Sequence, residues 1–326
     1  MKHQILALAV AALSFTACTN EDNISQDFLA DTPIKLNVSV DEPTTRAGYS
    51  NAELPEGFVL NVDHYLDLAN KIPDEKYSYP VWAKKVGDGW KTYKLNENFG
   101  GTDEEVTMLW ANMNDQVEVT ASTKVGEITI PTDQTSDEQL KQADVLYMTP
   151  TMIDPSKEGI KVDLQHAMSK INLTIELGSE YEFTDKIDQK ITDVKIGGTI
   201  APLSFDYDDK GNYIIKPFSH GKVKSITPLY TGETAFSKEA GKITKASATY
   251  EAILIPQTIA SGKFTVSFKV DGKLYEWTYN KELTLDPTIA YTLKLIAGND
   301  KVQPVSFSVN PWGEGNGKDG ENKETD

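Results

Sequence analysis

The feature that most constrains this chain is a strict two-residue alternation of apolar and polar side chains. In the stretch PIKLNVSV, residues 33–40, one face carries Ile34, Leu36, Val38 and Val40. The stretch KINLTIEL, residues 170–177, repeats the pattern with Ile171, Leu173, Ile175 and Leu177. Such alternation predicts strands with one buried face and argues against helices. The chain is therefore expected to bury its apolar side chains between sheets.

Further strands follow from the same pattern. Residues 263–279, KFTVSFKVDGKLYEWTY, indicate two strands joined by a tight turn at Asp271–Gly272. Two late strands are expected at residues 290–295 and 304–309, and weaker candidates lie at residues 57–66, 106–111, 117–122 and 144–150. Only SDEQLKQAD, residues 136–144, suits a short helix, with Leu140 on its apolar side. The order of elements favours antiparallel β-sandwiches.

The length of 326 residues is more than one typical domain requires and suits two domains. We expect two β-sandwiches in tandem, over residues 47–170 and 171–312, with a loosely defined boundary near residue 170. One long strand near the boundary could close the first sandwich while its continuation opens the second. The tail, residues 313–326, has no apolar side chain and is expected to be disordered.

The first residues are typical of an export signal. Lys2 precedes an apolar run that is too short to span a membrane, and FTAC at residues 15–18 is similar to a bacterial lipobox. We expect residues 1–17 to be removed as a lipoprotein signal peptide and Cys18 to carry the lipid. An ordinary secretory signal with an incidental cysteine is the alternative. Because Cys18 is the single cysteine, the exported chain can form no internal disulfide and must be stabilised by packing.

Several classes of function are disfavoured. A net charge of -17 and a pI near 4.7 repel nucleic acid phosphates and anionic lipid headgroups. The chain lacks HExxH, GxSxG, CxxC and phosphate-binding glycine motifs, and its histidines lie in unrelated segments. We therefore expect no enzymatic activity, no metal and no cofactor. Since carboxylates are plentiful, a hydrolase with a carboxylate pair stays a low-ranking alternative.

Three features resemble binding sites but have simpler explanations. The loop DYDDKGN has Asp206, Asp208 and Gly211 in EF-hand-like positions, but Lys210 and Pro217 stand where oxygen ligands are required, so a hairpin turn is expected. His166 has no second ligand at suitable spacing and is expected to be packed or hydrogen-bonded. Trp277 and Tyr279 follow the strand period and are expected in the core or in cross-strand pairs.

Arg46 is the only arginine in the chain, and it follows the first clear strand by the short linker DEPTT. This linker suits the extended form that proteases accept. Cleavage between Arg46 and Ala47 would remove residues 18–46, including the strand that carries Ile34, Leu36, Val38 and Val40. If that strand lies at an edge, its loss would expose an apolar groove that another strand could fill. The candidate donor is the strand with Val305, Phe307 and Val309, which could equally be the last strand of its own domain.

An ordered set of stretches resembles the fimbrillin family, the type V pilins of Bacteroides-like bacteria. The set is a lipobox with the acidic TNEDN, then TPIKLNVSV, TTRA, QHAMSKINLTIEL, YEAILIPQT, the 263–279 hairpin and VNPWGEG. The resemblance implies two transthyretin-like sandwiches and export as a lipoprotein to the outer membrane and cell surface. It also implies processing by an Arg-specific surface protease at Arg46 and Ala47, and polymerisation with other fimbrial subunits by strand exchange.

Some roles stay open at this point. A stalk subunit and a tip subunit both fit, while a lipid-retaining anchor subunit fits less well because of Arg46. The adhesion target is undefined. The rival from another class is a lipid-anchored surface glycan-binding protein of a nutrient-uptake system, which would share the lipobox, the sandwiches and the aromatic residues without needing an arginine at this junction.

Overall fold

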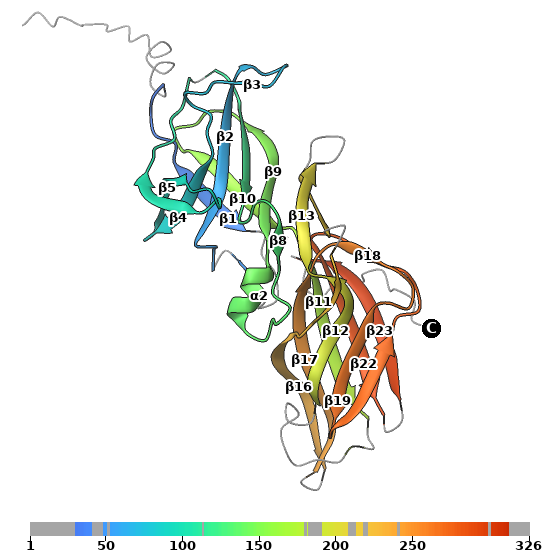
Figure 1. Cartoon of the computed structure of the whole chain (residues 1–326). Coiled ribbons are helices and arrows are strands. Elements are labelled where there is room, and N and C mark those ends of the chain that lie inside the picture. Colours follow the sequence, from blue (N-terminus) through green and yellow to red (C-terminus); the bar gives the residue numbers. More distant parts are fainter. Residues whose placement is uncertain are drawn as a thin grey trace, which may run out of the picture.

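The computed structural model describes residues 30–40, 48–50, 53–112, 114–178, 181, 191–207, 213–217, 221–239, 242–298 and 301–312. These residues form an almost entirely β structure with one short helix, α2 (Asp137–Ala143). The first half of the chain builds one body and the second half another, with α2, β8 and β13 near their junction (Figure 1). No helix within the described ranges is long and apolar enough to cross a membrane.

One nine-stranded sheet contains most of the first half. Its order is β1-β10-β9-β7-β2-β4-β5-β6, with β3 paired to β2. The sheet curls so that Val40 on β1 and Leu164 on β10 share a core with Phe58 and Leu60 on β2. The strands are β1 (Leu36–Val40), β2 (Gly57–Asp67), β3 (Ile72–Pro73), β4 (Val81–Val86), β5 (Gly89–Leu95), β6 (Gly101–Glu105), β7 (Val117–Ser122), β9 (Leu146–Ile153) and β10 (Ile160–His166).

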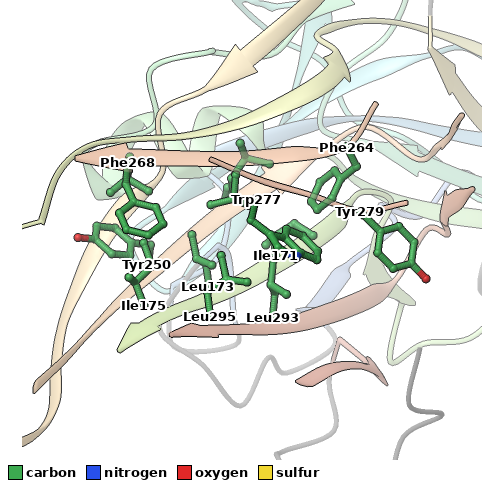
Figure 2. Close-up of a cluster of buried hydrophobic side chains, with 14 of the residues drawn as sticks. Ile171, Leu173, Ile175, Tyr250, Phe264, Phe268, Trp277, Tyr279, Leu293 and Leu295 are labelled. Atoms are coloured by element: carbon green, nitrogen blue, oxygen red, sulfur yellow. The ribbon is translucent and has the colours of Figure 1, made fainter. Parts of the chain in front are cut away.

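The second half contains a five-stranded and a four-stranded sheet that enclose one core. Their orders are β16-β17-β11-β22-β23 and β15-β12-β19-β20. Side chains from β11, β19, β20 and β22 meet between the sheets, as Figure 2 shows for Leu173, Phe268, Trp277 and Leu293. The strands are β11 (Ser169–Leu177), β12 (Ile191–Ile200), β15 (Val223–Ile226), β16 (Leu229–Glu239), β17 (Lys242–Leu254), β19 (Thr265–Val270), β20 (Lys273–Thr278), β22 (Ile289–Ala297) and β23 (Val302–Pro311). A small pair, β18 (Gln257–Ile259) and β21 (Leu283–Leu285), lies beside them.

The all-β class is confirmed, and most predicted elements are present. The turn at Asp271 and Gly272 has φ values of 49° and 81°, as a tight hairpin turn requires, and Trp277 and Tyr279 are buried in the core as expected. The helix begins with a capping box in which Ser136 and Gln139 bond each other's backbone, and Leu140 is buried.

One expected strand was wrong. Residues 106–111 form no strand; Leu109 makes one isolated bridge to Pro33, and Trp110 turns into the core. The antiparallel architecture is confirmed, and two pairings within it are parallel, namely β1 with β10 and β11 with β22. Alternation defines which face of a strand is buried but not the direction of its neighbour.

The two halves share contacts at their junction. The strand β8 (Ile128–Thr129) pairs with β13 (Pro202–Tyr207), which in turn pairs with β14 (Tyr213–Pro217). Gln134, fully buried, donates from Nε2 to the carbonyl of Ile253 and accepts the Ile253 N–H at Oε1, both at 2.8 Å. A third apolar cluster contains Leu140, Met168, Ile255 and Trp312. The chain passes from β10 to β11 at residues 167–168, next to the boundary expected near residue 170; the division into two domains stays a prediction.

Candidate strand-exchange site

The strand β1 lies at one end of the nine-stranded sheet. Among the described strands its partner is β10, and the two pair in parallel from Leu36 opposite Ile160 to Val40 opposite Leu164. Val40 is 2% exposed, and Ile34, Leu36 and Val38 are half-buried against the same core. The alternation read from residues 33–40 thus corresponds to an inward and an outward face. β1 itself is held by one row of backbone hydrogen bonds and by its apolar face. The residues just before it are also bonded to residues 108–110, because the Ile34 N–H donates to the Met108 carbonyl at 2.9 Å and the Trp110 N–H donates to the Thr32 carbonyl at 3.0 Å.

A glycine allows β1 to approach β10. Gly159 has φ +92°, and a Cβ at this position would overlap the backbone carbonyl of Lys35. That carbonyl accepts the N–H of Ile160 at 2.8 Å, which is the first contact of the parallel ladder. On the outer face, Asn37 Nδ2 donates to the Glu158 carbonyl at 2.9 Å, and the Ser39 hydroxyl bonds the Asp163 carboxylate. The docking of β1 therefore depends on backbone contact at its first residues.

A groove lies beside β1, facing the hairpin of β4 and β5. Its volume is about 410 Å³. Its walls combine apolar and charged side chains, namely Leu36, Asn37, Val38, Ser39, Leu54, Lys85, Asp88, Trp90 and Lys161. The sheet of the first half is thus open to solvent beside β1 on the side of this groove.

Both sides of the predicted processing junction are fixed at the same end of β10. Cys18, Arg46 and Ala47 lie outside the described residues. Before the junction, Val40 lies opposite Leu164. After it, Gly48 is buried beside Asp144, and the Tyr49 N–H donates to Asp144 Oδ2 at 2.9 Å. Cleavage between these two points would disconnect β1 while leaving the contacts of Gly48 and Tyr49 in place.

Asp144 belongs to a buried polar cluster at the junction of the two halves. The Nδ1 atom of His166 lies 2.9 Å from Asp144 Oδ1, and both side chains are almost completely buried. The His166 ring stacks on Trp312 with centroids 4.4 Å apart and an angle of 5° between the planes. His166 is therefore packed and hydrogen-bonded, as predicted. The cluster itself was missed, because Asp144, His166 and Trp312 are far apart in the sequence and share no spacing motif.

The C-terminal strand lies within its own sheet. Phe307 is 1% exposed and contacts four aromatic rings, those of Phe264, Trp277, Tyr279 and Tyr291. Val309 is half-buried against the same core. Val305 is 47% exposed, because a bulge shifts the register so that Ser306 and Pro304, but not Val305, pair with β22. The three side chains expected on one face are thus not equivalent.

The described residues do not assemble a metal site. Within these ranges no group of three His, Asp or Glu side chains is arranged to bind a metal ion. His64 is buried against Tyr77 and Trp110, and burial lowers the pKa of its imidazole. Asp206 lies on the hairpin of β13 and β14, as predicted, while Asp208, Lys210 and Gly211 fall outside the described residues.

The fold and the edge strand define a class: an all-β protein of several sheets whose first strand lies at an edge and precedes a single arginine. A model of fimbrillin-like proteins matches residues 82–312. This match covers well over half of the chain, which therefore belongs to the fimbrillin-like family.

Solved structures agree with the fold. A candidate cell adhesion protein from Bacteroides ovatus is 17% identical, with 87% of this chain and 98% of that chain covered and a TM-score of 0.55. A second candidate cell adhesion protein, from Bacteroides uniformis, is 13% identical, with coverage of 86% and 98% and a TM-score of 0.52. No curated protein sequence matched the chain.

Proposed function

We propose that this chain is a structural or adhesive subunit of a cell-surface fimbria, that it is exported as a lipoprotein on Cys18, and that it is cleaved after Arg46. Assembly then proceeds by strand exchange at the position of β1. Membership in the fimbrillin-like family supports the fimbrial role. The candidate cell adhesion proteins of similar fold support an adhesive one. Other fimbrial subunits are the expected partners, and the ligand for adhesion stays undefined.

The observation that carries the proposal is the position of β1. This strand lies at a sheet edge, its apolar face completes the core of the first half, and it is the last described element before the single arginine. One cut would convert β1 from part of the chain into a ligand held without a covalent bond. An Arg-specific protease would find no second site in the subunit.

The loss of β1 would destabilise the subunit unless another strand took its place. Fully burying one Val, Leu or Ile side chain contributes about 1.5–3 kcal/mol. Val40 is buried, and Leu36, Val38 and the preceding Ile34 are half-buried, so together they contribute several kcal/mol. Removal also leaves the backbone groups of β10 from Ile160 to Leu164 without their β1 partners. A subunit in this state gains free energy by accepting any strand of matching alternation, including one from another subunit.

The contacts of β23 disfavour it as the donor strand. To donate Val305, Phe307 and Val309, the subunit would have to withdraw Phe307 from its aromatic neighbours, and losing a buried Phe costs about 3–5 kcal/mol. The contacts favour the alternative that β23 completes its own sheet.

The glycan-binding alternative gains no support from the tryptophans. Trp110, Trp277 and Trp312 are buried, and Trp82 and Trp90 are half-buried. A glycan platform requires exposed aromatic faces, and none of the five tryptophans is exposed.

The test is limited digestion of the chain lacking its signal peptide with an Arg-specific protease, followed by intact mass and size analysis. We expect one cut after Arg46, and we expect the product, once β1 is released, to form oligomers with itself or with added fimbrial subunits. The Arg46→Lys variant keeps the charge and should resist cleavage and assembly. A chain that is not cut, or a cut chain that accepts no strand from any subunit, would contradict the proposal.

A further inference from the structure

We propose that the strand-exchange site has a second subsite, formed by the backbone of residues 108–110, which binds the residues that precede β1. This inference rests on the proposed function, because the ligand is the strand that occupies or replaces β1. In this structure the subsite is filled by residues 31–34. A strand that replaces β1 must therefore be longer than β1 itself and must present free N–H groups at the positions of Asp31 and Ile34.

The first argument is the number of backbone hydrogen bonds that join the two segments. The bonds run from the Asp31 N–H to the Trp110 carbonyl at 2.8 Å, from the Ile34 N–H to the Met108 carbonyl at 2.9 Å, and from the Trp110 N–H to the Thr32 carbonyl at 3.0 Å. The pairing is antiparallel, whereas β1 pairs with β10 in parallel. The residues before β1 thus have a backbone partner of their own, separate from the β10 ladder.

The second argument is that this partner uses the edge of the chain that β10 leaves free. Consecutive residues of a strand direct their backbone groups to opposite edges. The Ile34 N–H is bonded to Met108, whereas the carbonyl of the next residue, Lys35, accepts the Ile160 N–H of β10 at 2.8 Å. The chain is therefore held on both edges at this point. The groove beside β1 begins only at Leu36.

The third argument is that residues 108–110 are fixed by contacts other than those with the residues before β1. The side chains of Met108 and Trp110 are 2% and 1% exposed and belong to the core of the first half. The buried ring of His64 lies edge-on to the Trp110 ring, with centroids 6.2 Å apart, and is hydrogen-bonded to the backbone of Leu109. When residues 31–34 leave, the backbone groups that held them stay in place without partners. The subsite is thus preorganised for the next strand.

The geometry also defines which sequences fit. Pro33 lies opposite Leu109, and the hydrogen bonds of this bridge are made by the residues on either side of Pro33. A proline is therefore compatible with this position, although it has no N–H. A proline one residue later, in place of Ile34, would remove the donor to Met108.

Charge contributes less than the backbone to this subsite. The Asp31 carboxylate accepts from Lys76 Nζ at 3.0 Å and from the Tyr77 hydroxyl at 2.8 Å. The side chains of Asp31 and Lys76 are both exposed, and an exposed ion pair adds little to affinity. The ligand class is thus an extended peptide, recognised through its main chain.

The first experiment compares peptides that differ by one methyl group on the backbone. The chain is cleaved with an Arg-specific protease, the natural segment is released, and labelled peptides of residues 30–40 are titrated by fluorescence anisotropy. N-methylation of Ile34 removes the donor and leaves the Met108 carbonyl unpaired, so we expect binding to be at least about fivefold weaker. N-methylation of Val38 is the matched control. Its N–H lies on the same outer edge, where the groove is open, so the affinity should change by less than about twofold.

The second experiment uses the uncleaved chain without its signal peptide. Amide hydrogen exchange is measured residue by residue by NMR and corrected for the intrinsic rate of each amide. The Ile34 N–H is bonded to Met108, whereas the Val38 N–H lies on the open edge of the same segment. We expect the Ile34 amide to exchange at least about tenfold more slowly than the Val38 amide.

The outcomes distinguish the subsite from the proposed function. Equal affinity of the two N-methylated peptides, or equally fast exchange of the Ile34 and Val38 amides, would overturn the subsite. Neither result would affect cleavage after Arg46 or the binding of the unmodified peptide. A cleaved chain that does not bind the unmodified peptide would contradict strand exchange at β1, and the exchange rates of the uncleaved chain would still decide whether the subsite holds residues 31–34.

Discussion

At the scale of single residues, Gly159 controls whether β1 can dock. A Cβ at residue 159 would meet the carbonyl of Lys35, which belongs to the backbone and cannot be moved without shifting β1. We expect Gly159→Ala to lower the free energy of unfolding by the strain of a left-handed residue, about 1–2 kcal/mol, plus at least about 1 kcal/mol for the overlap. Amide hydrogen exchange should speed up in Leu36–Val40.

Gly126 provides the matched control for this substitution. Its φ is +82°, but a Cβ there would meet nothing within 4 Å. Gly126→Ala should therefore show the strain alone, with exchange in β1 unchanged. Equal losses in the two variants, or slow exchange in β1 of Gly159→Ala, would show that contact with Lys35 does not hold the strand.

A second prediction at this scale concerns alkaline pH. Burial raises the pKa of Tyr291 to about 12, and its hydroxyl donates to the Thr284 carbonyl at 2.9 Å. The folded state therefore keeps this proton between pH 10 and about 12, where the unfolded state loses it. The stabilisation from Tyr291 is complete below pH 10 and decreases as pH rises toward 12, by an amount on the order of 2 kcal/mol.

This pH effect is checked by chemical denaturation of the wild type and Tyr291→Phe at several pH values from 8 to 12. The Phe variant has no phenol to ionise, so its unfolding free energy should fall less steeply above pH 10. Parallel pH profiles for the two proteins would show that Tyr291 does not titrate differently on unfolding.

At the scale of elements, β1 should behave as a replaceable strand. After cleavage at Arg46 and release of the natural segment, a labelled peptide of residues 33–40 should bind the protein in one-to-one ratio. A peptide with Leu36→Asp and Val38→Asp has the same backbone but a charged inner face and should not bind, because each buried carboxylate would be unpaired. Fluorescence anisotropy measures both.

The uncleaved chain is the control for that binding, because its own β1 occupies the position. Binding of the labelled peptide to uncleaved protein would place the peptide elsewhere, for example in the groove lined by Leu54 and Trp90. Equal binding of both peptides to the cleaved protein would mean that the inner face of β1 does not determine the affinity.

The elements also show which parts of the fold could be predicted. A half-buried strand shows its apolar–polar alternation in its own sequence. Alternation and turn chemistry therefore predicted the strands at residues 34–40 and 170–177 and the hairpin at Asp271. Val305 was misplaced because a bulge changes register without any sign in the local pattern. Two contacts could not be predicted: the hydrogen bonds between Gln134 and the backbone of Ile253, and the stacking of His166 on Trp312. Each joins residues more than 100 positions apart in the sequence.

At the scale of the whole molecule, the contacts at the junction should make the two halves unfold together. Trp312 is 3% exposed, stacks on His166 of the first half and belongs to a cluster that includes Leu140 and Met168. Trp312→Ala should lower the free energy of unfolding by about 3–5 kcal/mol, the usual effect of truncating a buried Trp. The contacts that it removes lie at the junction and not in the core of either half.

We therefore expect calorimetry to show one transition for the wild type and two for Trp312→Ala. Trp277→Ala is the control, since Trp277 is similarly buried but lies in the core of the second half. It should lower the transition temperature while the transition stays single, because the junction keeps both halves coupled.

If Trp312→Ala also unfolds in one step, the coupling must come from other contacts, such as the pairing of β8 with β13 and the bonds of Gln134 to Ile253. If the wild type already unfolds in two steps, the two halves are thermodynamically independent. Cleavage after Arg46 in the first half would then not change the stability of the second half.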